Sequence, residues 1–419
     1  MKNLISDIKS RMILDSRGNP TVEAEVFLNG GIKGSASVPS GASTGALEAH
    51  ELRDGDSKYQ GKGVEQALNN IETYIKAELV GQDCSNQELI DNKLIDLDGT
   101  ENKKKLGANS MLAVSLANIR AYSSLVGKDL FEVIPEVYGE PKLPIPLMNI
   151  LNGGAHADNN IDIQEFMIVP HGFSSFSDSL RAGVEIYHVL KDKLKKDKMS
   201  TNVGDEGGFA PNLESSQVAL DIIVDAISIA GYKPGQEVSL ALDVASSEFY
   251  KDGKYIVEGS ELNSEEMSSF LAGLVDKYPI VSVEDGMAEN DWDGWKSLTE
   301  ILGSKIQLVG DDLFVTNANI LGKGIDKRCA NSILIKLNQV GTFTETINTL
   351  KLAKENEYTS VISHRSGETE DTFISHLAIG VGSKQTPQSF VDGHSSTCLL
   401  YTSDAADEGL GVDLGGRRI

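Results

Sequence analysis

Three apolar runs in the second half of the chain each end on a carboxylate: 239–243 (SLALD), 280–284 (IVSVE) and 306–311 (IQLVGD). Two later runs have the same design and end on a base: 332–336 (SILIK) and 360–364 (SVISH). The charged ends recur at intervals of 41, 27, 25 and 28 residues, and helix-type periodicity lies between them at 264–277, 293–302 and 342–356. This alternation predicts a βα repeat whose right-handed crossovers bring the strand ends to one face. In an α/β barrel that face carries the chemistry.

The first part of the chain has a different pattern. Short β-type runs at 11–14 and 21–27 are separated by turn residues, and apolar residues then recur three or four apart from Val64 to Leu79. A second helix is expected from Asn109 to Val126, before a proline-rich stretch. We therefore expect an N-terminal α+β domain over residues 1–138 and a catalytic α/β barrel over residues 139–384.

Composition argues against two classes of partner. The chain carries 62 acidic and 38 basic side chains, a net charge of −24, which repels both a nucleic-acid backbone and an anionic membrane surface. Its three cysteines are scattered, so neither a disulfide framework nor a zinc cluster is indicated. Neither a signal peptide nor a long apolar run is present, and we expect a cytoplasmic protein that binds no nucleic acid and no membrane.

The three strand-end carboxylates are candidate metal ligands. An isolated carboxylate in so acidic a chain is usually a solvated surface residue. Asp243, Glu284 and Asp311 instead close consecutive apolar strands, and converging carboxylates repel one another unless a cation neutralises them. Oxygen ligands alone suit Mg²⁺ or Mn²⁺, whereas zinc prefers histidine or cysteine. The spacing therefore predicts a site for a hard divalent cation.

Lys336 interrupts an apolar strand, where a lysine is costly unless it is paired or functional. It could act as a general base, with its pKa lowered by partial burial and by a nearby dication. It could equally be a structural partner for a neighbouring carboxylate. The residues alone leave both interpretations open.

Two glutamates and a histidine are further candidates. Glu165 follows Gln164 at the start of an apolar run, and Glu206 lies in the glycine-dense loop 202–211. A buried glutamate held protonated in such a loop can donate a proton to a leaving hydroxyl, although the loop could also be plain linker. His156 lies in a glycine-rich turn and could be an ordinary core or surface histidine.

Two segments suit an anionic substrate. The segment 364–368 (HRSGE) places an arginine fork and a hydroxyl at a strand end, which suits phosphate or carboxylate. The loop 40–45 (SGASTG) is rich in small residues and resembles a mobile lid. It lacks the lysine and the spacing of a Walker loop.

Together these motifs resemble the enolase family over residues 1 to about 384. The resemblance rests on 16–21 (SRGNPT), 40–45 (SGASTG), 164–167 (QEFM), 204–208 (GDEGG), 336–339 (KLNQ) and 363–371 (SHRSGETED). It implies a TIM-like (βα) barrel behind an N-terminal α+β domain, and a glycolytic hydro-lyase that interconverts 2-phosphoglycerate and phosphoenolpyruvate. It also implies two Mg²⁺ ions per active site and a homo-oligomer, a dimer or an octamer. The family's enzymes are cytoplasmic, with a cell-surface or secreted pool in some relatives.

The resemblance assigns roles to the metal and proton-transfer residues. A first Mg²⁺, which chelates the substrate carboxylate, would be held by Asp243, Glu284 and Asp311. Lys336 would take the C2 proton, and Glu206, helped by Glu165, would protonate the departing C3 hydroxyl. Neutralising the carboxylate first is what makes loss of the C2 proton feasible.

The remaining roles concern the substrate. Ser43 would contact a second Mg²⁺ shared with the phosphate, which Arg365 and Ser366 also bind. The pocket would be lined by Gln164, His156 and His364.

The family pattern fails after about Ser383. Enolases continue with a last strand bearing a lysine that binds the substrate carboxylate, whereas 385–394 (QTPQSFVDGH) has no such lysine. We therefore expect the last βα unit to be missing and the chain to be impaired. Residues 398–408 and 411–419 resemble a translated sequencing adapter, which predicts that 385–419 is a non-native tail. A true divergent C-terminus is the rival interpretation, and the absence of clear periodicity there weighs against it.

Two other functions compete with the hydro-lyase. A non-catalytic scaffold or surface-binding role would not need Lys336, Glu206 and three metal carboxylates together. Another member of the wider barrel superfamily, acting on a different carboxylate, would not need the 40–45 loop or the Arg365-Ser366 pair, which suit a phosphate.

Overall fold

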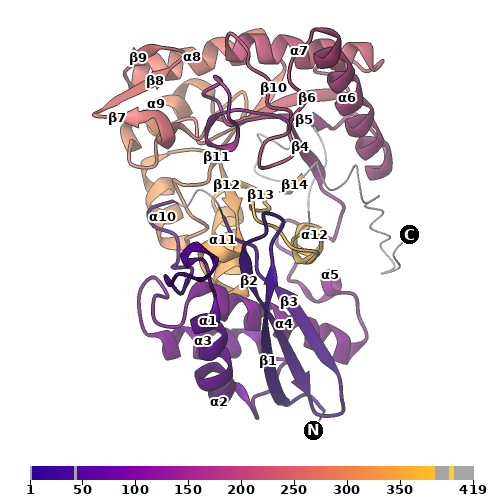
Figure 1. The fold of residues 1–419 in the computed structure, drawn as a ribbon, viewed down its shortest axis with the longest axis vertical. Coiled ribbons are helices and arrows are strands. Elements are labelled where there is room, and N and C mark those ends of the chain that lie inside the picture. Colours follow the sequence, from indigo (N-terminus) through magenta and orange to yellow (C-terminus); the bar gives the residue numbers. More distant parts are fainter. Residues whose placement is uncertain (1, 42–44, 383–395, 401–419) are drawn as a thin grey trace.

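The structure is a computed structural model that describes residues 2–41 and 45–382 in full and the backbone of 396–400. An N-terminal region, indigo to purple in Figure 1, lies below a barrel whose strands and helices run from magenta to yellow. Among the described residues, no helix combines the length and apolar character needed to cross a membrane.

The N-terminal region is an antiparallel sheet covered by helices. Its strands are β1 (Ile5–Leu14), β2 (Pro20–Leu28) and β3 (Lys33–Ser37), in that order. The helical segments are α1 (Glu65–Asn70), the π-helical turn η2 (Ile71–Ile75), α2 (Lys76–Leu79), α3 (Gln87–Asp98), α4 (Ala108–Val126) and α5 (Leu130–Val133). The meander and both predicted helices are therefore present, the first helix with a π turn inside it.

Gly34 sets how closely the sheet packs on α4. A Cβ built on Gly34 would lie 2.2 Å from the carbonyl oxygen of Ala117 and from the backbone nitrogen of Ala121. A side chain there would push β3 off the helix. The close approach lets the alternate residues Val22, Ala24 and Val26 of β2 be fully buried.

The second region is a closed barrel with the strand order β10-β11-β12-β13-β14-β4-β5-β6. The strands are β4 (Ile145–Asn152), β5 (Glu165–Pro170), β6 (Val238–Asp243), β10 (Ile280–Glu284), β11 (Gln307–Gly310), β12 (Ser332–Ile335), β13 (Thr359–Ile362) and β14 (Ser396–Leu400). The main helices are α6 (Phe176–Lys196), α7 (Ser216–Ile229), α8 (Ser264–Lys277), α9 (Trp292–Leu302), α10 (Ala318–Lys327), α11 (Phe343–Glu355) and α12 (Phe373–Gly380). A small sheet is made by β7 (Tyr250–Lys251), β8 (Lys254–Val257) and β9 (Ser260–Leu262). The predicted α/β barrel class is confirmed.

Local sequence explains where several helices begin. Ser175, Ser215 and Thr342 precede α6, α7 and α11, and each side-chain oxygen accepts a hydrogen bond from a backbone N–H of the first turn. These caps satisfy donors that the helix itself leaves unpaired.

One strand departs from a simple βα repeat. β5 runs antiparallel to both of its neighbours, β4 and β6, while the other pairs in the barrel are parallel. Its first residue, Glu165, therefore lies opposite Asp243, the last residue of β6. The reversed strand brings a carboxylate from its beginning to the face where the other strands end.

The sequence predicts that the family's own last βα unit is missing, and in the structure a segment of the tail, 396–400, takes the position of the eighth strand. The backbone of β14 lies between β13 and β4 and pairs in parallel with both. Strand pairing uses backbone groups, so the edges of β13 and β4 accept an extended segment without the family's sequence. The segment that follows, 401–419, lies outside the described residues.

The barrel interior is layered along its strands. An apolar cluster fills the middle and consists of Ile145, Leu147, Met167, Val169, Ala241, Val309, Leu334 and Val361. Strand side chains alternate between faces, so residues two positions away from this cluster also face inward. Toward one end these are Asp243, Asp311 and Lys336, and toward the other they are the neutral Ser239, Gln307 and Ser332. The apolar layer thus closes the bottom of the cleft described next.

Candidate active site

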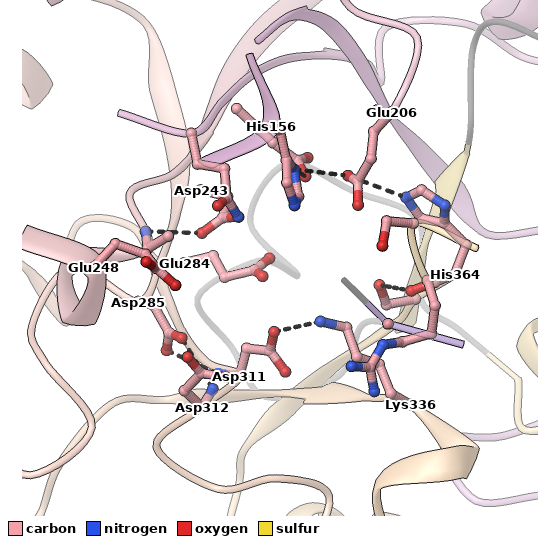
Figure 2. A pocket seen from close by; sticks show the side chains of 17 residues that line it. His156, Glu206, Asp243, Glu248, Glu284, Asp285, Asp311, Asp312, Lys336 and His364 are labelled. Carbon is pink, nitrogen blue, oxygen red and sulfur yellow. Dashed lines mark hydrogen bonds and ion pairs between the residues drawn. The ribbon is translucent and has the colours of Figure 1, made fainter. Parts of the chain in front are cut away.

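A cleft opens at the barrel face where the parallel strands end, and its lining is almost entirely polar (Figure 2). It contains eleven of the twelve predicted site residues: His156, Gln164, Glu165, Glu206, Asp243, Glu284, Asp311, Lys336, His364, Arg365 and Ser366. The twelfth, Ser43, lies outside the described residues. Side chains up to 210 positions apart in sequence thus meet in one cleft.

The candidate metal carboxylates lie side by side on neighbouring strands. Asp243 and Glu284 end β6 and β10, and Asp311 follows β11 directly. All three are buried, with exposed fractions of 6, 6 and 8%. Gln164 Nε2 donates to Asp243 Oδ2 at 2.8 Å, and Gln339 Nε2 donates to Asp311 Oδ1 at 2.8 Å, so two amides fix two of the carboxylates.

The surroundings of these carboxylates disfavour their ionised forms. Burial, together with the charge of Asp311, raises the pKa of Asp243 to about 6. Burial, and then Asp243 and Asp311, raise the pKa of Glu284 well above its usual value. A donor set of buried, mutually repelling oxygens fits a hard divalent cation such as Mg²⁺.

Asp285 is a site residue that the sequence analysis missed. Its two carboxylate oxygens accept hydrogen bonds from the backbone nitrogens of Asp311 and Asp312, each at 2.9 Å. Oxygens of these three aspartates lie within 4.8 Å of one another, close enough to hold a cation together; Asp243, Glu284 and Asp311 are not grouped this closely among the described residues. Burial and neighbouring carboxylates raise the pKa of Asp285 well above normal and that of Asp312 to about 8.

Asp285 thus orients Asp311 through its backbone. The signal that could have found it is the paired acidic residues at two successive strand ends, Glu284-Asp285 and Asp311-Asp312. Glu248, Gly41, Ala245 and Ser363 also line the cleft and were not predicted.

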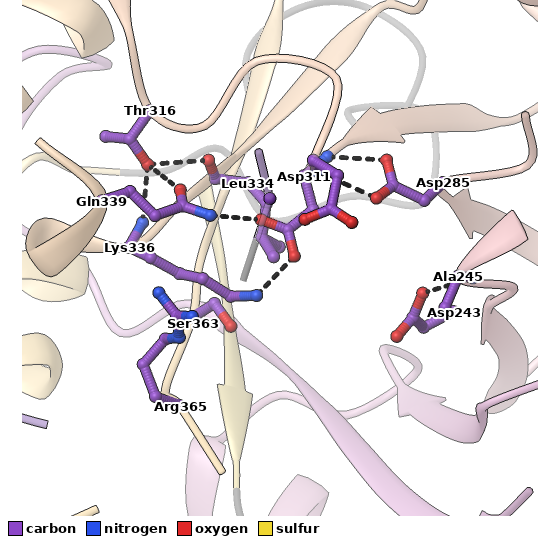
Figure 3. Close-up of polar contacts among 12 residues, drawn as sticks. Asp243, Ala245, Asp285, Asp311, Thr316, Leu334, Lys336, Gln339, Ser363 and Arg365 are labelled. Atoms are coloured by element: carbon purple, nitrogen blue, oxygen red, sulfur yellow. Dashed lines mark hydrogen bonds and ion pairs between the residues drawn. The ribbon is translucent and has the colours of Figure 1, made fainter. Parts of the chain in front are cut away.

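Lys336 follows β12 and forms an ion pair with Asp311 Oδ2 (Figure 3). Burial alone would lower its pKa, but the charges of Asp311 and Glu284 and the hydrogen bond to Asp311 together outweigh burial, and the pKa is raised. The paired carboxylate thus stabilises the ammonium form in this arrangement, and the lowering expected from a nearby dication stays a prediction. The ion pair agrees with the alternative role of Lys336 as the partner of a neighbouring carboxylate. Its role as the general base stays a prediction.

Across the cleft, Glu165 and Glu206 share a buried site with two histidines (Figure 2). His156 Nδ1 lies 3.5 Å from Glu165 Oε1 and 3.7 Å from Glu206 Oε2, and His364 Nε2 lies 3.6 Å from Glu206 Oε2. Burial and the charge of Glu206 raise the pKa of Glu165 well above normal. Burial would also raise the pKa of Glu206, but the hydrogen bond with Glu165 and the charges around it lower it instead.

The opposite pKa shifts favour one proton shared by the two glutamates, with Glu165 as its preferred site. Two buried carboxyl groups in contact cannot both ionise without a large repulsion. The expectation that Glu206 delivers the proton with help from Glu165 stays a prediction. The pair as a whole has what a general acid requires at neutral pH.

The predicted anion-binding residues lie beside Lys336. Arg365 and Ser366 follow β13, and both are buried, each with an exposed fraction of 4%. Arg365 Nη1 donates to Glu48 Oε2 at 2.9 Å and to Asn338 Oδ1 at 3.0 Å. Glu48, which comes from the N-terminal region, was not predicted as a site residue.

The chain also matches two known family models. Residues 5–134 match the enolase N-terminal domain, and residues 140–389 match the enolase C-terminal TIM barrel domain. Both matches agree with the order of the two regions in the structure and with the cleft at the barrel's strand ends. This chain belongs to the enolase family.

Proposed function

We propose that this protein interconverts 2-phosphoglycerate and phosphoenolpyruvate plus water. Membership of the enolase family supports a lyase of this type. The more specific assignment is supported by the shared lining of the cleft, where Lys336, the Glu165–Glu206 pair and the Arg365-Ser366 pair come together.

The observation that carries the proposal is the position of the proton-transfer groups. Lys336 follows β12 and Glu165 begins β5, and these strands are four positions apart in either direction around the eight-stranded barrel. A substrate between them would lose its C2 proton to one side and have its C3 hydroxyl protonated from the other. The elimination would thus use opposite faces of the substrate; Figure 2 shows Lys336 and Glu206 on different sides of the cleft.

Each residue has a defined task. The neutral Lys336 amine accepts the C2 proton, the C2–C3 double bond forms, and the hydroxyl leaves as water after taking a proton from the Glu165–Glu206 pair. Asp243, Glu284 and Asp311 would hold Mg²⁺. When bound, Mg²⁺ supplies positive charge beside the substrate carboxylate, where negative charge builds up as the proton leaves. Arg365 and Ser366 bind the phosphate.

The ion pair with Asp311 must weaken before Lys336 can act as a base. An amine accepts a proton only in its neutral form, and in this arrangement the carboxylate stabilises the ammonium. A cation ligated by Asp311 competes with the Lys336 ammonium for the carboxylate. Metal binding before proton transfer is the expected order.

The test is a paired assay of phosphoenolpyruvate formation from 2-phosphoglycerate, followed by ultraviolet absorbance. One sample is the 419-residue chain, and the other carries a family-type last strand with its lysine in place of 385–419. We expect Mg²⁺-dependent turnover by the second, abolished by EDTA, and almost none by the first. A folded, metal-loaded second version that stays inert would rule out the proposed reaction, and robust turnover by the first would overturn the account of the tail.

A further inference from the structure

Glu48 lies in the N-terminal region, and its carboxylate contacts Arg365, which lines the anion-binding side of the cleft. It forms an ion pair with Arg365, Nη1 to Oε2 at 2.9 Å and Nη2 to Oε1 at 3.3 Å. The exposed fractions of the two side chains are 8 and 3%, so the pair is shielded from water. A shielded, two-point contact of this kind restricts an arginine far more than a surface pair would.

Among the described residues, each hydrogen-bond partner of the Glu48 carboxylate is a donor. Besides the two guanidinium nitrogens, Gly45 N donates to Oε1 at 3.1 Å and Gln339 Nε2 donates to Oε1 at 3.3 Å. A carboxylate accepts at both oxygens, whereas an amide of the same shape would turn an NH₂ group toward one set of donors. The site therefore requires the charge and the acceptor capacity of Glu48, and its shape alone is not enough.

Gln339 connects this ion pair to the metal side of the cleft. Its Nε2 also donates to Asp311 Oδ1 at 2.8 Å, and its Oε1 accepts from Thr316 Oγ1 at 2.6 Å (Figure 3). The threonine contact fixes which end of the amide is the acceptor, so the NH₂ end must serve both carboxylates. Glu48, Gln339 and Asp311 thus form one continuous network.

The guanidinium is confined on its other sides as well. Asn338 Oδ1 accepts from Nη1 at 3.0 Å. A Cβ built on Gly41 would lie 1.9 Å from Nη2, so the backbone of Gly41 lies directly against the guanidinium. The arginine is therefore fixed by contacts from both regions of the molecule.

We propose that Glu48 is a positioning residue for anion binding. It holds the Arg365 guanidinium in place for the substrate phosphate and, through Gln339, connects it to Asp311. The identity of the anion rests on the proposed function. The ion pair and its network do not depend on that function.

The experiment measures affinity for 2-phosphoglycerate by calorimetry in EDTA, so that no turnover occurs, using the full chain. Glu48→Gln keeps the shape and loses the carboxylate, whereas Glu48→Asp keeps the carboxylate and is one methylene shorter. We expect Glu48→Gln to weaken binding by roughly 10- to 100-fold, the range for a lost charge-assisted hydrogen bond, and Glu48→Asp to weaken it less. Glu345→Gln is the matched control, because Glu345 forms an ion pair with Lys103 across the same two regions and has no part in the cleft.

A double-mutant cycle shows whether Glu48 acts through Arg365. In an Arg365→Lys background the guanidinium group is absent. Adding Glu48→Gln to that background should therefore weaken binding by less than about threefold. Additive losses, unchanged affinity in Glu48→Gln, or tighter binding by Glu48→Gln than by Glu48→Asp would each overturn the proposal. If Glu48→Gln does not fold, the same cycle is run with Glu48→Asp.

Failure of the proposed function is a separate outcome. If the unmodified chain does not bind 2-phosphoglycerate, the assignment of phosphate as the anion is rejected. The Glu48–Arg365 pairing is then tested by thermal unfolding of the unmodified chain, Glu48→Gln, Arg365→Lys and the double variant. Shifts in melting temperature that are smaller in the double variant than the sum of the single ones support the pairing, and additive shifts refute it.

Discussion

The strand ends of the barrel and the layer two residues below them are built on the same strands from opposite kinds of side chain. Asp243, Asp311 and Lys336 occupy the upper layer, and Ala241, Val309 and Leu334 lie beneath them. In the upper layer Asp243 and Asp311 are buried and Lys336 is half-buried, and the pKa values of Asp243 and Lys336 are raised, whereas the lower side chains form a continuous apolar cluster.

This difference separates function from stability along a single strand. Burying several carboxylates destabilises a fold unless cations or hydrogen bonds offset the repulsion. The apolar layer contributes the opposite term and also closes the cleft from below. Changes in the upper layer should therefore alter activity more than stability, and changes in the lower layer the reverse.

The largest expected effect is on activity, from Lys336→Met. Methionine keeps most of the side-chain volume but cannot accept the C2 proton, so kcat should fall by about 10²- to 10⁴-fold, the usual contribution of a general base. The measurement is steady-state kinetics of the version with a family-type C-terminal strand, with melting temperature as the check on folding. Retention of more than a tenth of kcat would show that Lys336 serves Asp311 as a structural partner and is not the base.

Leu334→Ala tests the layer below on the same strand. Leu334 is fully buried, and removing three carbons from a packed core should lower the free energy of unfolding by about 3 kcal/mol. The kcat of the molecules that remain folded should change by less than about threefold. Urea unfolding combined with kinetics at low denaturant measures both. A loss of kcat comparable to that of Lys336→Met would mean that the two layers are not separable.

Much of this arrangement could be predicted from the sequence because its signals are local. An apolar run that ends on Asp243, Glu284 or Lys336 is visible within about six residues, and so is the helical period that follows each run. The reversal of β5 could not be predicted, because 165–170 (EFMIVP) is an almost continuous apolar run, buried throughout, and such a run does not indicate strand direction. Orientation depends on how the connections cross the sheet.

Contacts between residues that are distant in sequence also could not be predicted. Glu48 and Arg365 are 317 positions apart, and no pattern near either residue predicts their pairing. The raised pKa of Lys336 was missed for the same reason: burial could be inferred locally, but the contact with Asp311 could not. The electrostatics of this site depend on tertiary distances, and only residue types and their approximate layer follow from the sequence.

A third layer at the opposite end of the barrel sharpens the comparison. Gln307 is fully buried, accepts a hydrogen bond from Ser282 Oγ at 2.9 Å and donates to Thr359 Oγ1 at 2.7 Å. Gln307→Leu leaves both hydroxyls without this partner, so unfolding should become easier by about 1–2 kcal/mol. Activity should not change, because the apolar layer separates Gln307 from the cleft. Thermal unfolding and kinetics give the two numbers, and a tenfold loss of kcat would contradict the layered arrangement.

The smallest expected effect concerns pH and His171, which lies beyond the end of β5 with Nε2 2.9 Å from Ser239 Oγ. Burial lowers the pKa of His171 below its ordinary value, so below about pH 6.5 the unfolded chain binds a proton that the folded chain does not. The free energy of unfolding should therefore fall as pH decreases through 6.5, by less than about 1.4 kcal/mol per pH unit, and level off below the folded-state pKa.

His171→Asn should flatten this slope, whereas His188→Asn, on the exposed side of α6, is the matched control. Urea unfolding at several pH values between 5 and 7.5 measures the slopes. An unchanged slope in His171→Asn would show that this end of the barrel does not contribute to the acid sensitivity of the fold.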